Sequence, residues 1–296
     1  MSAPAVFAAG RDFVAREARV LEQRVFATIF EGAPSEGVLA ALRAYQNEDG
    51  GLGHGLEPDK RCPASQPLDV AFAFQTLDAA GAVDVSLMRR ACDFLAGLAD
   101  EDGGVPIVLP SIASYPRAEH WGDGEFPPSL NPTAGIAGRA LKAGIEHPWL
   151  DAATRFCWRQ LDIALPADAH TILEALVFLE HVSDRQRAEG FIPCVLGELR
   201  TATFFLADPG DSAYGLTPLH FAPAPSSRWR TAFSDEEIDA WLRRLERDQQ
   251  RDGGWPLTWS APSTASQLAW RGQKTLWALT VLAAHRRLEA PSSYRG

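Results

Sequence analysis

The residues best suited to chemistry stand in one short stretch, directly after the first of three Asp-Gly-Gly triplets. His54 is followed by the acids Glu57 and Asp59 and by the bases Lys60 and Arg61. A histidine and two carboxylates this close together can donate and accept protons, and Arg61 can hold a polar group of a substrate. A solvated turn whose acids and bases pair at the surface, with little effect on stability, is the alternative interpretation.

Asp69 is a further candidate acid because it stands one turn into an otherwise apolar helix that we predict over residues 66–80. Desolvation raises the pKa of a carboxyl that faces an apolar cavity, and this is how a general acid is made. A carboxylate at this position also stabilises the helix N-terminus through the helix dipole. Gln66, at the start of the same helix, is a candidate substrate ligand.

Other candidates are spread along the chain. His170 opens a helix predicted over residues 169–182 and is a candidate acid or base, with a packed core histidine as the alternative. A long loop before residue 132 carries Trp121 and is predicted to cover a cavity as a lid, since loops of this length are usually functional or disordered. Asn131, at its end, is a candidate ligand or a helix N-cap.

The last third of the chain is rich in aromatic residues and carries two cations on one predicted helix face. Indole faces stabilise a developing positive charge, and the two cations are suited to a carboxylate or diphosphate. The candidate substrate-binding residues here are Tyr214, Trp255, Trp259, Trp270, Arg271 and Lys274.

A repeat in the sequence sets where these candidate residues lie in the fold. Its three Asp-Gly-Gly triplets are Asp49–Gly51, Asp102–Gly104 and Asp252–Gly254, and two weaker junctions lie near residues 165–168 and 208–211. Glycines that tolerate positive φ end a helix sharply, so each junction separates two helices. A two-helix unit cannot bury its apolar face alone and must stack on its neighbours.

The spacing of apolar residues predicts an all-α protein with two sets of helices. The more apolar, inner set is predicted at residues 11–30, 66–80, 132–143, 169–182, 214–220 and 267–288. The outer set is predicted at residues 35–46, 86–98, 148–163, 185–205 and 234–250. We expect one domain over residues 1–296, in which the starts of the inner helices surround a central cavity.

The last junction carries a family resemblance. Leu245 and Gln249, followed by Asp252–Trp255, resemble the glutamine–tryptophan repeat motif of squalene–hopene and oxidosqualene cyclases. Asp49–Leu52 and Asp102–Val105 are weaker copies of the same motif. The resemblance to the squalene cyclase and prenyltransferase repeat proteins implies an (α/α)6-type toroid of inner and outer helices. Such a fold hosts several chemistries, so it does not settle the function.

The motifs that carry catalysis in these proteins are not matched. Class II cyclases use Asp-x-Asp-Asp, and the nearest segment, residues 100–102, lies inside a repeat turn. Protein prenyltransferases hold zinc through Asp-x-Cys, whereas Asp59–Cys62 has one residue too many. Zinc needs three or four tightly arranged ligands and the seven histidines are scattered. We therefore expect no metal and no cofactor.

Three functions stay open. A terpene cyclase-like or prenyl-substrate enzyme, with a carboxyl general acid in an aromatic-lined cavity, is favoured by the apolar inner helices. A hydrolase or lyase acting on a polar, glycan-like substrate would use the same carboxylates with His54 or His170. A non-catalytic binding module is the third. The formal net charge of −10 argues against a general nucleic-acid binder. A small-molecule substrate, no membrane span and a cytoplasmic location are expected.

Overall fold

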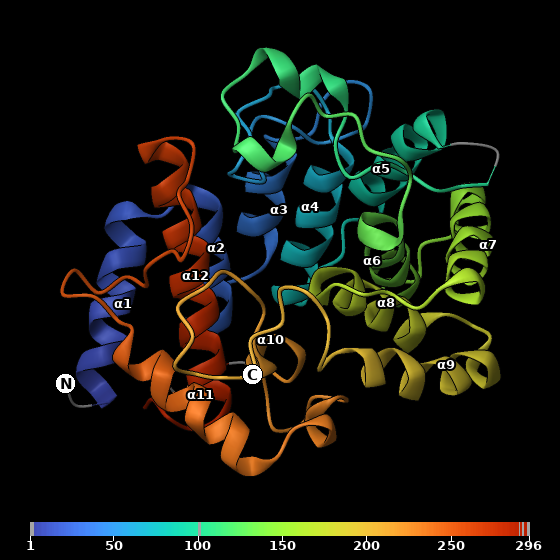
Figure 1. Cartoon of the computed structure of the whole chain (residues 1–296). Helices are drawn as coiled ribbons and strands as arrows, with labels where there is room; N and C mark the ends of the chain where they lie inside the picture. The colour runs from blue at the N-terminus through green and yellow to red at the C-terminus, as the bar shows by residue number, and fades with distance from the viewer. Residues whose placement is uncertain (1–2, 100–101, 290, 292, 295–296) are drawn as a thin grey trace. The chain divides into compact units, whose positions relative to one another are not determined.

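The computed structural model of the chain describes residues 3–99, 102–289, 291, 293 and 294 (Figure 1). In this part of the chain the regular elements are helices, and only isolated backbone bridges such as Gln46–Leu52 are present besides them. The predicted all-α class is confirmed. None of the described helices is long and apolar enough to cross a membrane. Asp100 and Glu101, from the acidic turn considered above, lie outside the described residues.

The chain divides into two compact units, of which the second covers Leu42–Phe205. Helices α4, α6 and α8 pack side by side in sequence, and α5, α7 and α9 pack against them (Figure 1). These helices are α4 (Pro67–Ala79), α5 (Val85–Leu98), α6 (Leu130–Lys142), α7 (Pro148–Ile163), α8 (Ala169–His181) and α9 (Arg185–Glu198).

The first unit combines Met1–Ala41 with Leu206–Gly296. Its longest helix, α12, packs against α1, α2 and α11. The helices of this unit are α1 (Ala3–Glu17), α2 (Val20–Phe30), α10 (Pro218–Phe221), α11 (Asp235–Arg247) and α12 (Thr264–Ala284), and α3 (Glu36–Arg43) crosses from this unit into the second.

Most of the predicted helices are confirmed, and the differences have local causes. The helix predicted over residues 11–30 is two helices, because Arg19 is extended, with ψ 159°, between α1 and α2. The helix predicted over 185–205 ends at Glu198, because Thr203 forms backbone hydrogen bonds with Ala167 and Ala169 at the start of α8 instead. The short helix predicted over 214–220 is reduced to α10.

The first and last Asp-Gly-Gly junctions are tight turns that pack against a neighbouring helix. In the first, Gln46 Nε2 donates to Gly50 O and to Leu87 O of α5, at 2.8 and 3.0 Å. In the last, Gln249 Nε2 donates to Gly253 O and to Val6 O of α1, both at 2.9 Å. The glutamine of the repeat motif therefore ties each of these turns to a neighbouring helix.

Gly135 allows α6 to approach α8 closely, and this makes a specific prediction for stability. A Cβ atom at this position would collide with Glu174 Oε2, which accepts a hydrogen bond from Arg139 Nη1 at 2.6 Å. Gly135→Ala is expected to destabilise the protein by about 1–3 kcal/mol through overpacking. Gly190→Ala, on the exposed face of α9 with open space around it, is the control and is expected to add about 0.5–1 kcal/mol. Chemical denaturation measures both, and equal effects at the two glycines would contradict the prediction.

Candidate functional site

The structure brings Glu57 and Asp69 together around the ammonium group of Lys60 in the second unit. Lys60 Nζ donates to Asp69 Oδ1 at 2.9 Å and to Glu57 Oε2 at 3.2 Å. Asp69 Oδ1 also accepts the backbone N–H of Glu57 at 2.6 Å, and Glu57 Oε1 accepts that of Asp59 at 3.2 Å. We call Glu57, Asp59, Lys60 and Asp69 the carboxylate cluster; all four are at most 5% exposed.

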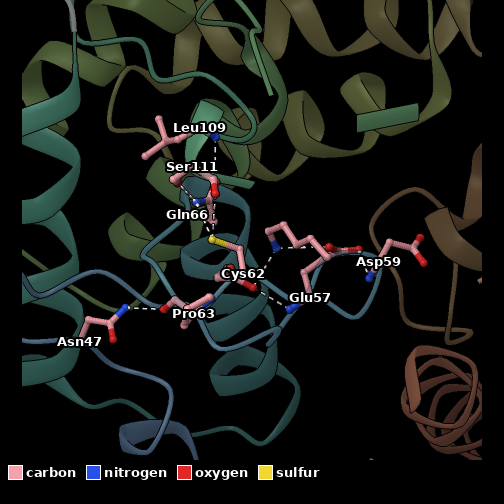
Figure 2. A network of polar contacts seen from close by, with 10 residues as sticks. Asn47, Glu57, Asp59, Cys62, Pro63, Gln66, Leu109 and Ser111 are labelled. Atoms are coloured by element: carbon pink, nitrogen blue, oxygen red, sulfur yellow. Dashed lines mark hydrogen bonds and ion pairs between the residues drawn. The ribbon is translucent and has the colours of Figure 1, made fainter. Parts of the chain in front are cut away.

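The start of α4 positions this cluster. Gln66 is the extended residue before the helix, and Asp69 stands in its first turn, so its carboxylate meets the chain that returns from the first Asp-Gly-Gly turn. Figure 2 shows Gln66 directed at the loop that follows α5, where its Nε2 donates to Ser111 Oγ and its Oε1 accepts from Leu109 N, at 2.8 and 2.7 Å. The predicted substrate ligand thus has protein partners at both ends of its amide.

Burial and crowding of negative charge set the proton affinities in the cluster. Burial, together with the charges of Asp59 and Asp69, raises the pKa of Glu57 to about 7, although Lys60 opposes this. Burial alone would lower the pKa of Lys60, but Asp69 and Glu57 outweigh it and the pKa is raised. Lys60 is therefore charged at neutral pH, and Glu57 is the carboxyl that exchanges a proton near pH 7.

A loop covers the cluster. It contains the short 3-10 helices η1 (Pro110–Ser114) and η2 (Glu119–Trp121). Two backbone hydrogen bonds tie it down, from Arg61 N to Pro116 O at 2.9 Å and from Ala118 N to Asp59 O at 2.8 Å. Burial lowers the pKa of His120, and the charge of Asp59 partly offsets this.

The same loop surrounds an open depression of about 420 Å³ lined by Tyr115–Glu119, Gly122 and Asp123. Its lining includes Pro116 and Ala118, the two residues whose backbone carries those hydrogen bonds. Trp121 is buried in the loop, where its ring contacts those of His120 and Phe126. The loop predicted to act as a lid therefore carries an open surface depression next to the segment of the carboxylate cluster.

Neither a protein-family model nor a curated protein matches this chain. Within the described residues, no group of three or more histidine, cysteine, aspartate or glutamate side chains is arranged to hold a metal ion. The carboxylate cluster combines one carboxyl with a pKa near 7, two further carboxyl groups and one cation, which is a set suited to acid–base work.

Three other predicted residues of the second unit lie apart from the contacts of the cluster. His54 is exposed, has a positive φ of 59°, and its Nε2 lies 2.8 Å from Asn47 Oδ1. Arg61 is exposed at the end of the segment. Asn131 has a non-helical backbone before a cis bond to Pro132, at the start of α6.

The predicted residues of the last third all belong to the first unit and fall into two groups. Trp255 and Arg271 brace the last Asp-Gly-Gly turn: the Trp255 indole donates to Leu245 O at 2.8 Å, and Arg271 pairs with Asp252 at 2.8 Å. The other group, which we call the aromatic cluster, consists of three aromatic residues and Lys274. Tyr214, Trp259 and Trp270 meet edge to face at 5.2 and 5.3 Å, and Lys274 Nζ lies 5.4 Å from the Trp259 ring centre.

Lys60 and His120 lie in the second unit but are not among the site residues predicted from the sequence. In the sequence Lys60 is only one of two bases after the first Asp-Gly-Gly triplet, whereas in the structure it is fully buried and links two carboxylates. The available signal was its rarity: it is one of three lysines, and it lies between two acids and an arginine. His120 carried no spacing relative to Asp59 that could have indicated their proximity.

Proposed function

We propose that this chain is an enzyme that uses the Glu57 carboxyl as a general acid–base catalyst on a polar, uncharged small molecule such as a glycan. The reaction class is hydrolysis or elimination. One observation carries the proposal: a buried carboxyl with a pKa of about 7 lies next to two further carboxylates. A catalytic acid or base works best when its pKa is close to the operating pH, and burial beside like charges is how proteins achieve this.

The raised pKa of Glu57 favours the polar-substrate class over the isoprenoid class. An alkene is a very weak base, so its protonation needs a strongly acidic donor. With a pKa of about 7, Glu57 is a weaker acid than an ordinary carboxyl. A leaving-group oxygen, or a carbon-bound proton next to a carbonyl, is a better match for such a group.

The other residues have supporting roles in this proposal. Lys60 bridges Asp69 and Glu57 and so keeps the segment of Glu57 in place, and Asp59 is the candidate partner base. The loop that carries His120 and the depression acts as a lid, which must release its two backbone hydrogen bonds for a substrate to reach the acid. Closure of such a lid excludes water from the reaction.

A terpene cyclase-like or prenyl-substrate enzyme is the second candidate, and the aromatic cluster of the first unit favours it. Tyr214, Trp259 and Trp270 offer ring faces to a cationic intermediate, and Lys274 offers a charge to a polar head group. The α/α toroid implied by the repeat motif, as a single domain over residues 1–296, is part of this second proposal.

Ligand-induced stabilisation tests the two candidates against each other. The melting temperature is measured with oligosaccharides, geranylgeranyl diphosphate and a squalene-like hydrocarbon, since binding to the native state must raise it. We expect a shift with oligosaccharides, followed by turnover whose pH profile has one limb near pH 7. A shift with the isoprenoids alone would reject the polar-substrate proposal in favour of the second candidate.

A further inference from the structure

Phe204 presents an exposed aromatic ring from a backbone conformation that phenylalanine rarely adopts. Its φ is +61°, and 53% of the residue is exposed. A bulky residue with positive φ is a genuine outlier, and such strain persists only where the surroundings enforce it, commonly at ligand sites. Here Thr203 enforces it: its N–H donates to Ala167 O at 3.0 Å, and its carbonyl accepts from Ala169 N at 2.9 Å.

The exposed ring lies beside a histidine and a carboxylate at the start of α8. The rings of Phe204 and His170 meet edge to face, with centres 5.8 Å apart. His170 Nδ1 lies 3.8 Å from Asp168 Oδ1, and the two side chains are 29% and 36% exposed. Burial lowers the pKa of His170 although Asp168 and Glu174 oppose this, so the imidazole is neutral at pH 7 and offers both a donor and an acceptor.

The charges around this group favour a neutral ligand. Glu174 lies one turn further along α8, where it pairs with Arg139 at 2.6 Å and accepts from Gln75 Nε2 at 3.2 Å. The guanidinium of Arg139 is therefore engaged by a carboxylate. Asp168 Oδ1 accepts from Thr171 N at 3.0 Å as the N-cap of α8, and the side chain is still partly exposed. A ligand with hydroxyl donors and an apolar face fits this combination better than an anion does.

We infer that Phe204, His170 and Asp168 form a sugar-binding site, in which the apolar face of a pyranose ring stacks on Phe204. The sugar hydroxyls donate to the Asp168 carboxylate and exchange hydrogen bonds with the His170 imidazole. This inference rests on the proposed function for the class of substrate, and it adds a second contact region for that substrate in the unit that holds the carboxylate cluster.

Nuclear magnetic resonance of the full chain tests the site. The His170 ring signals, assigned through their loss in His170→Gln, are followed during titration with methyl glucoside, methyl galactoside, methyl mannoside, maltose and cellobiose. At least one probe is expected to shift them in a saturable manner. Both Phe204→Ala and Phe204→Gly are expected to bind roughly tenfold more weakly, because each removes the stacking ring.

The two variants separate binding from folding. Glycine adopts positive φ freely, so Phe204→Gly is expected to melt at a higher temperature than Phe204→Ala while binding no better. Unshifted His170 signals with all five probes, or wild-type affinity in Phe204→Gly, would overturn the inference. If wild type and Glu57→Gln both bind sugar but neither turns it over, the sugar-binding site stands and the acid–base function is rejected. If wild type turns over a saccharide while the His170 signals do not shift, the acid–base function stands and the sugar-binding site is rejected.

Discussion

Replacing Lys60 by methionine is expected to lower the free energy of unfolding by about 3–5 kcal/mol at pH 7.5, as removal of one partner from a buried ion pair does. The ammonium group is fully buried and lies within 3.2 Å of two carboxylates. Methionine fills a similar volume but carries no charge, so Glu57 and Asp69 would be left buried and mutually repulsive. Urea denaturation of the two proteins measures the difference.

Two comparisons make the Lys60 prediction specific. Lys142→Met is the matched control, because Lys142 pairs with Asp78 at 2.5 Å but is 48% exposed, and an exposed pair contributes about 0–1 kcal/mol. The deficit of Lys60→Met should also shrink at pH 5, where the carboxyls that lack their cation can take up protons. If Lys60→Met lost no more stability than Lys142→Met, the cluster would have to be hydrated in solution.

The helices were predictable from sequence because their signals are local. Apolar periodicity located α4, α6, α8 and most outer helices within a few residues, and the Asp-Gly-Gly triplets located the turns. The role of Gln249 is also local, because its side-chain amide donates to Gly253 O in the turn of the same motif. The break at Arg19 was missed because apolar residues continue on both sides of it, so periodicity alone does not reveal it.

The site was predictable only in part, because its interactions join distant segments. The sequence indicated Glu57, Asp59 and Asp69 individually, from acids next to an apolar helix. Glu57 and Asp69 are twelve residues apart, and they share one lysine only because the chain returns from the first turn to the start of α4. The approach of His120 depends on a loop of irregular structure, for which no periodic signal exists. The sequence therefore indicates which side chains can exchange protons, but not which of them contact one another.

Glu57→Gln is expected to remove the part of the pH dependence of folding stability that comes from the Glu57 carboxyl. The pKa of Glu57 is about 7 in the folded protein and about 4.5 in an unfolded chain. A raised carboxyl pKa contributes stability below pH 4.5 that is lost as pH rises through 7, an effect of about 3 kcal/mol. Wild type should therefore lose that much between pH 4.5 and pH 8 relative to Glu57→Gln, by denaturation at several pH values.

The same variant separates a catalytic carboxyl from a structural one. If Glu57 is the acid–base group, glutamine should lower kcat on the responding saccharide by about 10²–10⁴-fold, and the limb near pH 7 should vanish. Glu48→Gln changes an exposed acid of the preceding turn and should leave both the pH profile and the stability curve as in wild type. A variant that loses the pH dependence of folding but keeps its kcat would show that the proton on Glu57 serves the fold alone, because the two readouts depend on the same group through different reactions.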